Sequence, residues 1–311
     1  MKYSLVIPVY RNEENIDPLL AALTKINEEL HKELEVVFVV DGSPDKSQSR
    51  LEELLPSQGF KAQVLASSRN FGAFSAIRLG LEAARGAKIA VMAADLQEPP
   101  ELVREFFAAL DSGEYDLVFG VRASRDDPWT STLASNIFWW CYQKGINPAV
   151  PVGGVDMFAM TAEFRDHIIG MREANSSLLA LLFWVGGRRK FVPYHRRKRE
   201  IGVSAWTFTK KVTYLLDSTF AFTDLPVRLM MTFGVLGIIL AIVLAAIIFT
   251  ARMNGIAVVP GYAGTMLTIL FFGALNLFGL GVVGNYAWRA YENTKNRPLN
   301  IIANRKYFDQ E

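Results

Sequence analysis

The stretch VMAADLQEPPEL, Val91–Leu102, decides the fold, because a buried strand stops within it and a helix starts. The apolar run that leads into it, Lys88–Ala94, is typical of a strand that is covered on both faces. The two prolines that follow cannot continue a strand's hydrogen bonding, and proline suits the first turn of a helix. One carboxylate, Asp95, and one amide, Gln97, therefore lie where the strand gives way to the helix.

The same alternation of apolar runs and helical segments extends over residues 1 to about 200. It predicts strands at Ser4–Val9, Glu35–Val40, Ala62–Ser67, Lys88–Ala94 and Tyr115–Val121, with helices at Glu13–Glu33, Ser47–Leu55, Ala73–Ala84 and Pro100–Ser112. Such a pattern favours an α/β fold with a mostly parallel sheet. Ligands of these sheets bind beyond the carboxyl ends of the strands. The polar clusters fall there: Tyr10–Glu13, Asp41–Ser43, Arg69–Gly72 and Asp95–Gln97.

The C-terminal third predicts a membrane anchor. Residues 229–251 contain no charged side chain, and at about 1.5 Å per residue a helix of this length crosses a hydrocarbon core of ~30 Å. A second uncharged stretch, 253–288, holds a short loop and another span that begins near Tyr262. Two such stretches in tandem predict an integral membrane protein with a helical hairpin.

Basic residues predict the orientation of that hairpin. The loop NGIAVVPG, residues 254–261, contains no Lys or Arg, whereas basic residues precede the first span and follow the second. Both termini are therefore expected in the cytoplasm. The N-terminus does not have the pattern of a signal peptide, because its apolar part is short and ends at Arg11. The single cysteine, Cys141, excludes an intrachain disulfide, which fits a cytoplasmic location.

The segment Trp206–Pro226 joins the two parts. Its apolar residues recur at helical spacing, which predicts a helix in the membrane interface, although an ordinary soluble amphipathic helix has the same pattern. We therefore expect an α/β domain at 1–205, an interfacial helix at 206–227, a hairpin at 228–290 and a cytoplasmic tail at 291–311. The fingerprints GxGxxG, GxxxxGK[ST] and HExxH are absent, which disfavours dinucleotide, P-loop and zincin chemistry.

Taken alone, VVDGSPD is explained by a simple Asx-type turn. With IPVYRNEEN, SRNFG, DLQEPPE and RKREIGVSAW in this order, however, the chain resembles glycosyltransferase family 2, and within it the polyprenyl-phosphate glycosyltransferases. The resemblance covers nearly the whole chain, including the two spans and the tail motif NRPLNII. It implies a GT-A fold, which is Rossmann-like. It also implies inverting transfer of a sugar from a nucleotide diphosphate to a polyprenyl phosphate, undecaprenyl phosphate above all.

The resemblance also assigns the donor site. It implies that Pro8, Tyr10, Glu13 and Asp41 hold the nucleotide sugar, which carries uridine or guanosine. Arg69 of SRNFG belongs to the same pocket, although a structural ion pair with a carboxylate would explain it equally well.

The family's metal motif usually reads Asp-x-Asp-x-Gln, and here Ala93 replaces its first Asp. Asp95 and Gln97 remain to bind a divalent cation, Mg²⁺ or Mn²⁺, and Asp95 is counted among the catalytic residues. Mg²⁺ is commonly held by one or two carboxylates together with phosphate oxygens and water, so one carboxylate is enough for a weaker site. The alternative is a plain helix cap.

Asp156 follows Gly153 and Gly154 and enters an apolar run, where a carboxylate is either an expensive buried charge or a functional one. The resemblance makes Asp156 the catalytic aspartate. In inverting transfer it would orient the attacking oxygen opposite the leaving group.

A basic block, RRKFVPYHRRKREIGVS, precedes the membrane part. By physics it binds anionic lipid at about 1 kcal/mol per basic residue near the surface. By resemblance, Arg199 and Ser204 contact donor or acceptor phosphate, and Arg196 belongs to the same set. Ala205 departs from the family, which commonly has Lys there. Nucleic acid is a poor partner for a chain of net charge +2.

Two other classes of protein compete with this interpretation. A processive polysaccharide synthase usually carries QxxRW and more spans, and QxxRW is absent. A non-catalytic scaffold that binds lipid-linked sugars would explain Ala93, but not the retention of the other site residues. Relatives suggest a homo-oligomer, a tetramer. Neither the sugar nor the nucleotide follows from the sequence.

Overall fold

The computed structural model describes residues 1–124, 143–144, 148–151, 155–196, 208–254 and 261–309. The described residues form an eight-stranded sheet in the order β7-β5-β6-β4-β1-β2-β3-β8. The strands are β1 Tyr3–Val9, β2 Leu34–Val40, β3 Lys61–Ser67, β4 Lys88–Val91, β5 Leu117–Ser124, β6 Val155–Thr161, β7 Arg189–His195 and β8 Ile302–Phe308. β6 and β8 run antiparallel to their neighbours and the other strands run parallel, which confirms a mostly parallel sheet.

Helices cover both faces of the sheet. One face carries α1 Ile16–Glu29, α2 Ser47–Leu54 and α4 Glu101–Asp111, and the other carries α3 Ala73–Ala83, α6 Ala162–Gly170 and α7 Leu178–Val185. The central strands alternate between the two cores: Val36 and Phe38 face the first, and Val37 and Val39 face the second. This is why Val36–Val40 of β2 is an unbroken apolar run rather than an alternating one.

Most of the predicted elements form, with shifted bounds such as Leu117–Ser124 for the strand predicted at Tyr115–Val121, and two of them differ near the site. The first predicted helix is split into the 3-10 turn η1 Glu13–Asn15 and α1, and β4 ends at Val91 instead of Ala94. Met92 still donates its N–H to the Val6 carbonyl, but the chain then turns away, and Leu96 adopts a positive φ of 53°. A non-glycine residue with such a φ breaks strand geometry, so the ladder stops before the apolar run does.

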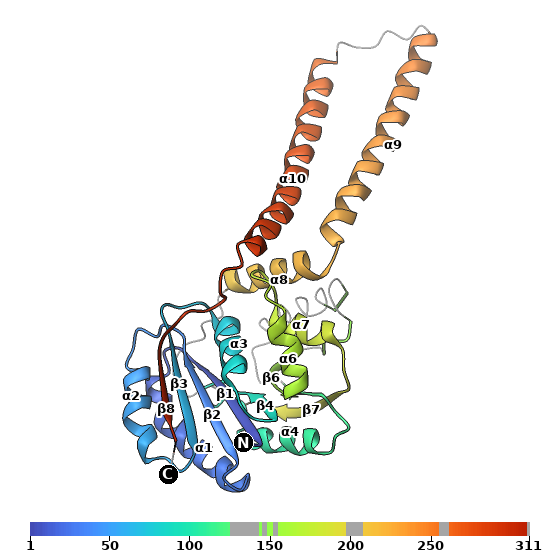
Figure 1. The fold of residues 1–311 in the computed structure, drawn as a ribbon. Coiled ribbons are helices and arrows are strands. Elements are labelled where there is room, and N and C mark those ends of the chain that lie inside the picture. The colour runs from blue at the N-terminus through green and yellow to red at the C-terminus, as the bar shows by residue number, and fades with distance from the viewer. Residues whose placement is uncertain (125–142, 145–147, 152–154, 197–207, 255–260, 310–311) are drawn as a thin grey trace.

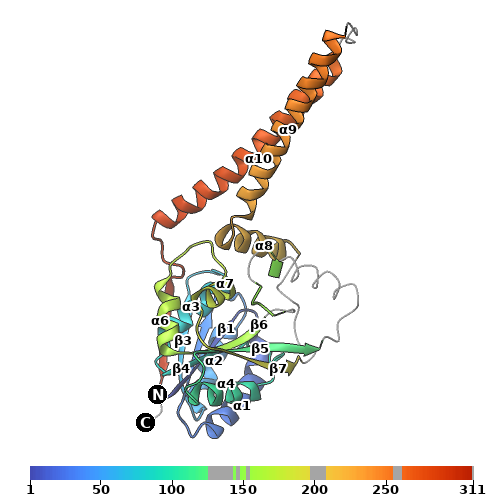
Figure 2. The ribbon, with the colours of Figure 1, turned by 90° about the vertical axis from the view of Figure 1, so that its right-hand side faces the viewer.

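The helices of the C-terminal third extend from one edge of this sheet. Helix α8 Phe208–Phe222 lies between the sheet and two long helices, α9 Leu225–Met253 and α10 Tyr262–Thr294, as Figures 1 and 2 show. Both long helices are long and apolar enough to cross a membrane.

Polar contacts tie the hairpin to the sheet domain. Arg289 of α10 pairs with Asp217 of α8 at 2.6 Å and donates to the Asn175 carbonyl at 3.3 Å. Ser177, which precedes α7, donates to the Tyr214 hydroxyl of α8 at 2.8 Å. These contacts fix α8 over the sheet domain.

The chain then returns to the sheet. β8 pairs antiparallel with β3 and runs away from the hairpin, so that its end and the N-terminus lie together at the far edge (Figure 1). The parallel strands run the opposite way. Their carboxyl ends therefore face α8 and the hairpin.

Candidate active site

The loop after β1 is tied to the loop after β2. Backbone N–H groups of the first donate to side chains of the second: Arg11 to Ser43 at 2.7 Å, Asn12 to Ser47 at 3.1 Å, and Glu13 to Asp45 at 3.1 Å. The Glu13 carboxylate in turn accepts from the Lys46 N–H at 3.1 Å. These two loops, residues 10–13 and 43–47, form one connected surface, called the ledge below, at the carboxyl ends of the parallel strands (the carboxyl edge). Two of the predicted nucleotide-binding residues, Tyr10 and Glu13, lie on it and are partly exposed.

Asp45 is the centre of that ledge. Burial alone would raise the pKa of Asp45, but hydrogen bonds from the Ser43 and Ser47 hydroxyls and from two backbone N–H groups hold the pKa below its ordinary value. Asp45 thus stays ionised and keeps both loops in place.

The predicted nucleotide-binding residue Asp41 is almost fully buried and faces the loop after β3. Its carboxylate accepts from the N–H groups of Phe71 at 2.9 Å and Gly72 at 2.8 Å, just before α3 begins. Next to it, Gly42 has φ 57°, and a Cβ there would meet the Arg69 carbonyl carbon at 2.4 Å. Asp41 and Gly42 therefore hold the loop after β2 (the second loop) against the loop after β3 (the third loop). Carboxylate oxygens have further lone pairs for a ligand.

Arg69 lies exposed on this third loop. Its guanidinium stacks over the Phe71 ring at 4.0 Å and donates to the Asn70 carbonyl at 3.0 Å. Within the described residues, no carboxylate pairs with Arg69, so the structural ion pair that the sequence left open is not seen there. Its charge faces solvent at the carboxyl edge.

The loop after β4 carries the predicted cation ligands Asp95 and Gln97. The Gln97 N–H donates to the Asp95 carboxylate at 3.3 Å, which closes a small turn around Leu96. Asp95 is partly exposed, whereas the Gln97 side chain is buried and its carbonyl oxygen accepts from an Arg196 terminal N–H at 2.6 Å.

Glu98, the next residue, was not among the predicted site residues. Its side chain is only 2% exposed and forms an ion pair with Arg196, Oε1 to Nε, at 3.5 Å. The contact is an ion pair and not a hydrogen bond, since the Arg196 Nε makes no hydrogen bond to a described residue. The signal in the sequence was an acidic residue directly before two prolines. Its partner lies on β7, and no local pattern could identify it.

A divalent cation fits this loop through Asp95. Hard oxygen donors suit Mg²⁺ and Mn²⁺, and one carboxylate completed by phosphate oxygens and water is a usual set. Gln97 is a poorer ligand than predicted, since a guanidinium already contacts its carbonyl oxygen. The described residues hold no group of three or more His, Cys, Asp or Glu placed to bind a metal ion.

Asp156 is the second residue of β6. Because β6 is antiparallel, it begins at the carboxyl edge of its neighbours: Val155 is opposite Val121 near the end of β5, and Phe158 is opposite Val91 at the end of β4. The backbone of Asp156 thus lies at the same edge as the loops above. Arg199 and Ser204 lie outside the described residues.

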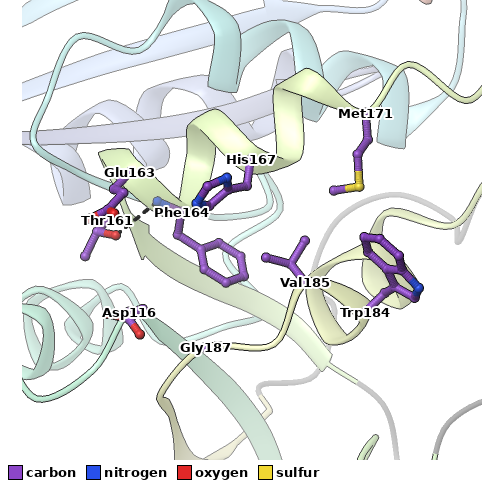
Figure 3. Close-up of a pocket in the computed structure, with 9 residues that line it drawn as sticks. All are labelled: Asp116, Thr161, Glu163, Phe164, His167, Met171, Trp184, Val185 and Gly187. Atoms are coloured by element: carbon purple, nitrogen blue, oxygen red, sulfur yellow. Dashed lines mark hydrogen bonds between the residues drawn. The ribbon is translucent and has the colours of Figure 1, made fainter.

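Hollows of the described structure also lie away from these loops. One of about 520 Å³ opens at the opposite edge of the sheet, before β5 and β7, and Phe164, Val185 and Trp184 border it (Figure 3). The pKa of Asp116 in its wall is lowered by hydrogen bonds from Arg188, so this carboxylate is already satisfied. Nothing in this hollow resembles the polar ledge at the carboxyl edge.

Comparisons with known proteins agree on one family. Residues 4–165 match the model of glycosyl transferase family 2. An uncharacterised glycosyltransferase of Synechocystis sp. is 32% identical over 304 residues, which cover 97% of this chain and 95% of the relative. A prophage bactoprenol glucosyl transferase homolog of Escherichia coli is 31% identical over 97% of this chain and 98% of its own length. Among solved structures, the glucosyl-3-phosphoglycerate synthase of Mycobacterium tuberculosis in complex with UDP is 17% identical over 70% of this chain and 80% of its own, with a TM-score of 0.49.

Proposed function

Because the chain belongs to glycosyl transferase family 2 and is a glycosyltransferase with the GT-A type of sheet, we propose that it transfers a sugar from a nucleotide diphosphate sugar to a polyprenyl phosphate. One observation carries the proposal. The carboxyl edge, with its predicted donor site, faces α8 and the two apolar helices (Figure 1). A soluble donor and a membrane-bound acceptor can meet at this edge.

The names of relatives support the acceptor. The Escherichia coli homolog and a bactoprenol glucosyl transferase of Shigella phage SfV, 30% identical over 98% of this chain, match both the sheet domain and the hairpin. Bactoprenol is a polyprenyl carrier, and this chain has the same arrangement of parts. Undecaprenyl phosphate is the acceptor that we propose.

The donor would lie on the ledge. Pro8, Tyr10 and Glu13 would bound the nucleotide, with Asp41 and Arg69 on the facing loops. Asp95 would hold the divalent ion, which supplies charge neutralisation for the departing diphosphate when bound. A fixed ledge of this kind lowers the entropy cost of bringing the donor to the acceptor.

The acceptor needs little activation. The second pKa of a phosphate monoester is about 6, so its oxygen is already an anionic nucleophile at neutral pH. Asp156 would therefore orient the acceptor opposite the leaving group rather than remove a proton, which gives inversion at the anomeric carbon. Arg199, Ser204 and Arg196 are the predicted contacts to donor or acceptor phosphate.

The test is direct. The full-length protein in detergent micelles is incubated with radiolabelled UDP- and GDP-sugars, Mg²⁺ and undecaprenyl phosphate. We expect label in the organic phase with one of the donors, as a single sugar on the lipid. Label in a long polymer would indicate the processive synthase instead, and binding of the lipid-linked sugar without transfer from any donor would indicate the scaffold.

We also propose that both termini and the sheet domain are cytoplasmic. The support is the distribution of basic residues around the hairpin. A cysteine introduced at Asn254 should react with an impermeant reagent from outside the cell, and one introduced after Glu311 should not. Reaction of both from the same side would contradict the hairpin.

A further inference from the structure

We propose that Glu98 is a positioning residue. It anchors Arg196, so that the guanidinium serves as a fixed cation for the diphosphate of the donor and supplies part of the charge compensation that the altered metal motif gives up. The inference rests on the proposed function. It concerns how the donor site is built, rather than which sugar it transfers.

Burial forces Glu98 to have a cationic partner. A carboxylate whose side chain is 2% exposed is costly to desolvate unless it is paired. A cationic side chain that contacts it is Arg196, directly after β7. β7 lies three strands away from β4 in the sheet, so this pair also holds the loop after β4 to the end of a distant strand.

Arg196 is only partly used by these contacts. A guanidinium has five N–H donors. Within the described residues, one of the Arg196 N–H donors forms a hydrogen bond, to the Gln97 side-chain carbonyl at 2.6 Å. The Arg196 side chain is 31% exposed. Within that part of the chain the remaining donors are not engaged, and Asp95 lies two residues before Gln97 on the same loop. Planar guanidinium groups bind phosphate oxygens through paired, charge-assisted hydrogen bonds.

The altered motif explains why such a cation matters here. Ala93 stands where the family has a carboxylate, so the loop offers a divalent ion one anionic ligand, Asp95. A guanidinium on the Gln97 carbonyl repels a second cation from that oxygen. Both features weaken the binding of the divalent ion, so that more of the diphosphate charge must be neutralised by side chains of the protein. A cation held in place by a buried carboxylate meets it without an ordering cost at the moment of binding.

The proposal is tested by nucleotide binding, measured by calorimetry on the full-length protein in detergent. Arg196→Met should weaken binding of the nucleoside diphosphate about tenfold or more in EDTA, the scale of one hydrogen bond to a charged group, and should leave binding of the nucleoside alone unchanged. Glu98→Gln, which keeps the shape and removes the charge, should weaken diphosphate binding in the same direction but less. The double variant should bind no more weakly than Arg196→Met, because Glu98 acts through Arg196.

A matched pair provides the control. Arg188 and Asp116 form an ion pair at 2.7 Å at the opposite edge, and Arg188→Met and Asp116→Asn should bind the diphosphate as the wild type does. Arg196→Lys keeps the charge and should recover part of the affinity. Thermal unfolding midpoints identify any variant that fails to fold, and Glu98→Gln then decides the matter alone.

Three outcomes would overturn the inference. They are wild-type diphosphate binding in Arg196→Met, equal losses for nucleoside and diphosphate, and an unchanged affinity in Glu98→Gln. Each of these leaves the proposed function intact. A wild-type protein that binds no nucleoside diphosphate at all would instead overturn the proposed function.

Discussion

The two edges of the sheet hold most of their carboxylates differently, with the pair of Glu98 and Arg196 as an exception at the carboxyl edge. At the amino edge, carboxylates pair with basic side chains: Asp111 with Lys2 and Lys88, Asp116 with Arg188, and Glu35 with Arg85. At the carboxyl edge, Asp41 accepts from two backbone N–H groups, and Asp45 accepts from hydroxyl and backbone N–H groups. Among the described residues, no Lys or Arg side chain pairs with either of these two.

This difference distinguishes carboxylates that stabilise the fold from carboxylates that keep their charge near a ligand site. At the amino edge, a carboxylate that is paired with a basic side chain has its charge offset and stabilises the fold. A carboxylate held by N–H dipoles keeps its net charge, and the basic groups nearby remain available for a ligand. The carboxyl edge, which faces the membrane helices, therefore offers fixed charge of both signs.

The largest expected effect is on stability, at the amino edge. Glu35 is fully buried, and its carboxylate accepts hydrogen bonds from Ser4, from Gln63, and from the side chain and the N–H of Arg85. Glu35→Gln would set an amide NH₂ against donors and should destabilise the protein by about 3 kcal/mol or more, measured by chemical unfolding. Transfer at a temperature where the variant is folded should be nearly unchanged.

The same substitution should flatten the acid limb of the stability profile. Burial tends to raise the pKa of Glu35, but hydrogen bonds from Gln63, Arg85 and Ser4 lower it overall. A lowered pKa means stability that is present above the unfolded value, about 4.3, and is lost as the pH falls through the folded value. An equally steep acid limb in Glu35→Gln would contradict this role.

At the carboxyl edge, Asp156→Asn should act on turnover instead. We expect a loss of about 100-fold, the scale of a positioning or base residue, with an unchanged unfolding midpoint. If positioning dominates, the residual activity should rise little between about pH 7 and about pH 9, because an anionic phosphate needs no base. Steep rescue at high pH would restore a general-base role.

The smallest effect is expected from Ala93→Asp. The substitution adds a second carboxylate to the loop that holds Asp95, so the apparent affinity for Mg²⁺ or Mn²⁺ should rise by up to about tenfold while turnover is preserved. Titration of activity with metal after EDTA treatment measures this. The same metal dependence in both proteins would show that residue 93 does not face the ion.

Local patterns predicted most of the fold and only part of the site. β1 to β3 and the two long helices follow from runs of apolar residues, which are local properties of the chain. β8 was not predicted, because Ile302–Phe308 becomes a strand only by pairing with β3, far away in sequence. The Glu98–Arg196 pair was missed for the same reason. The resemblance placed Asp41 in the donor site, but its hydrogen bonds to the third loop required the fold.

The central claim is that sugar transfer takes place at the edge that faces the membrane. It is tested most directly by the initial rate of labelled-sugar transfer to undecaprenyl phosphate for two matched variants, Asp95→Asn at the carboxyl edge and Asp116→Asn at the amino edge. Each removes one charge and preserves the side-chain shape. We predict that Asp95→Asn loses about 100-fold or more, since it removes the anionic ligand of the ion, while Asp116→Asn stays within about twofold of the wild type. Equal rates in the two variants would contradict the account.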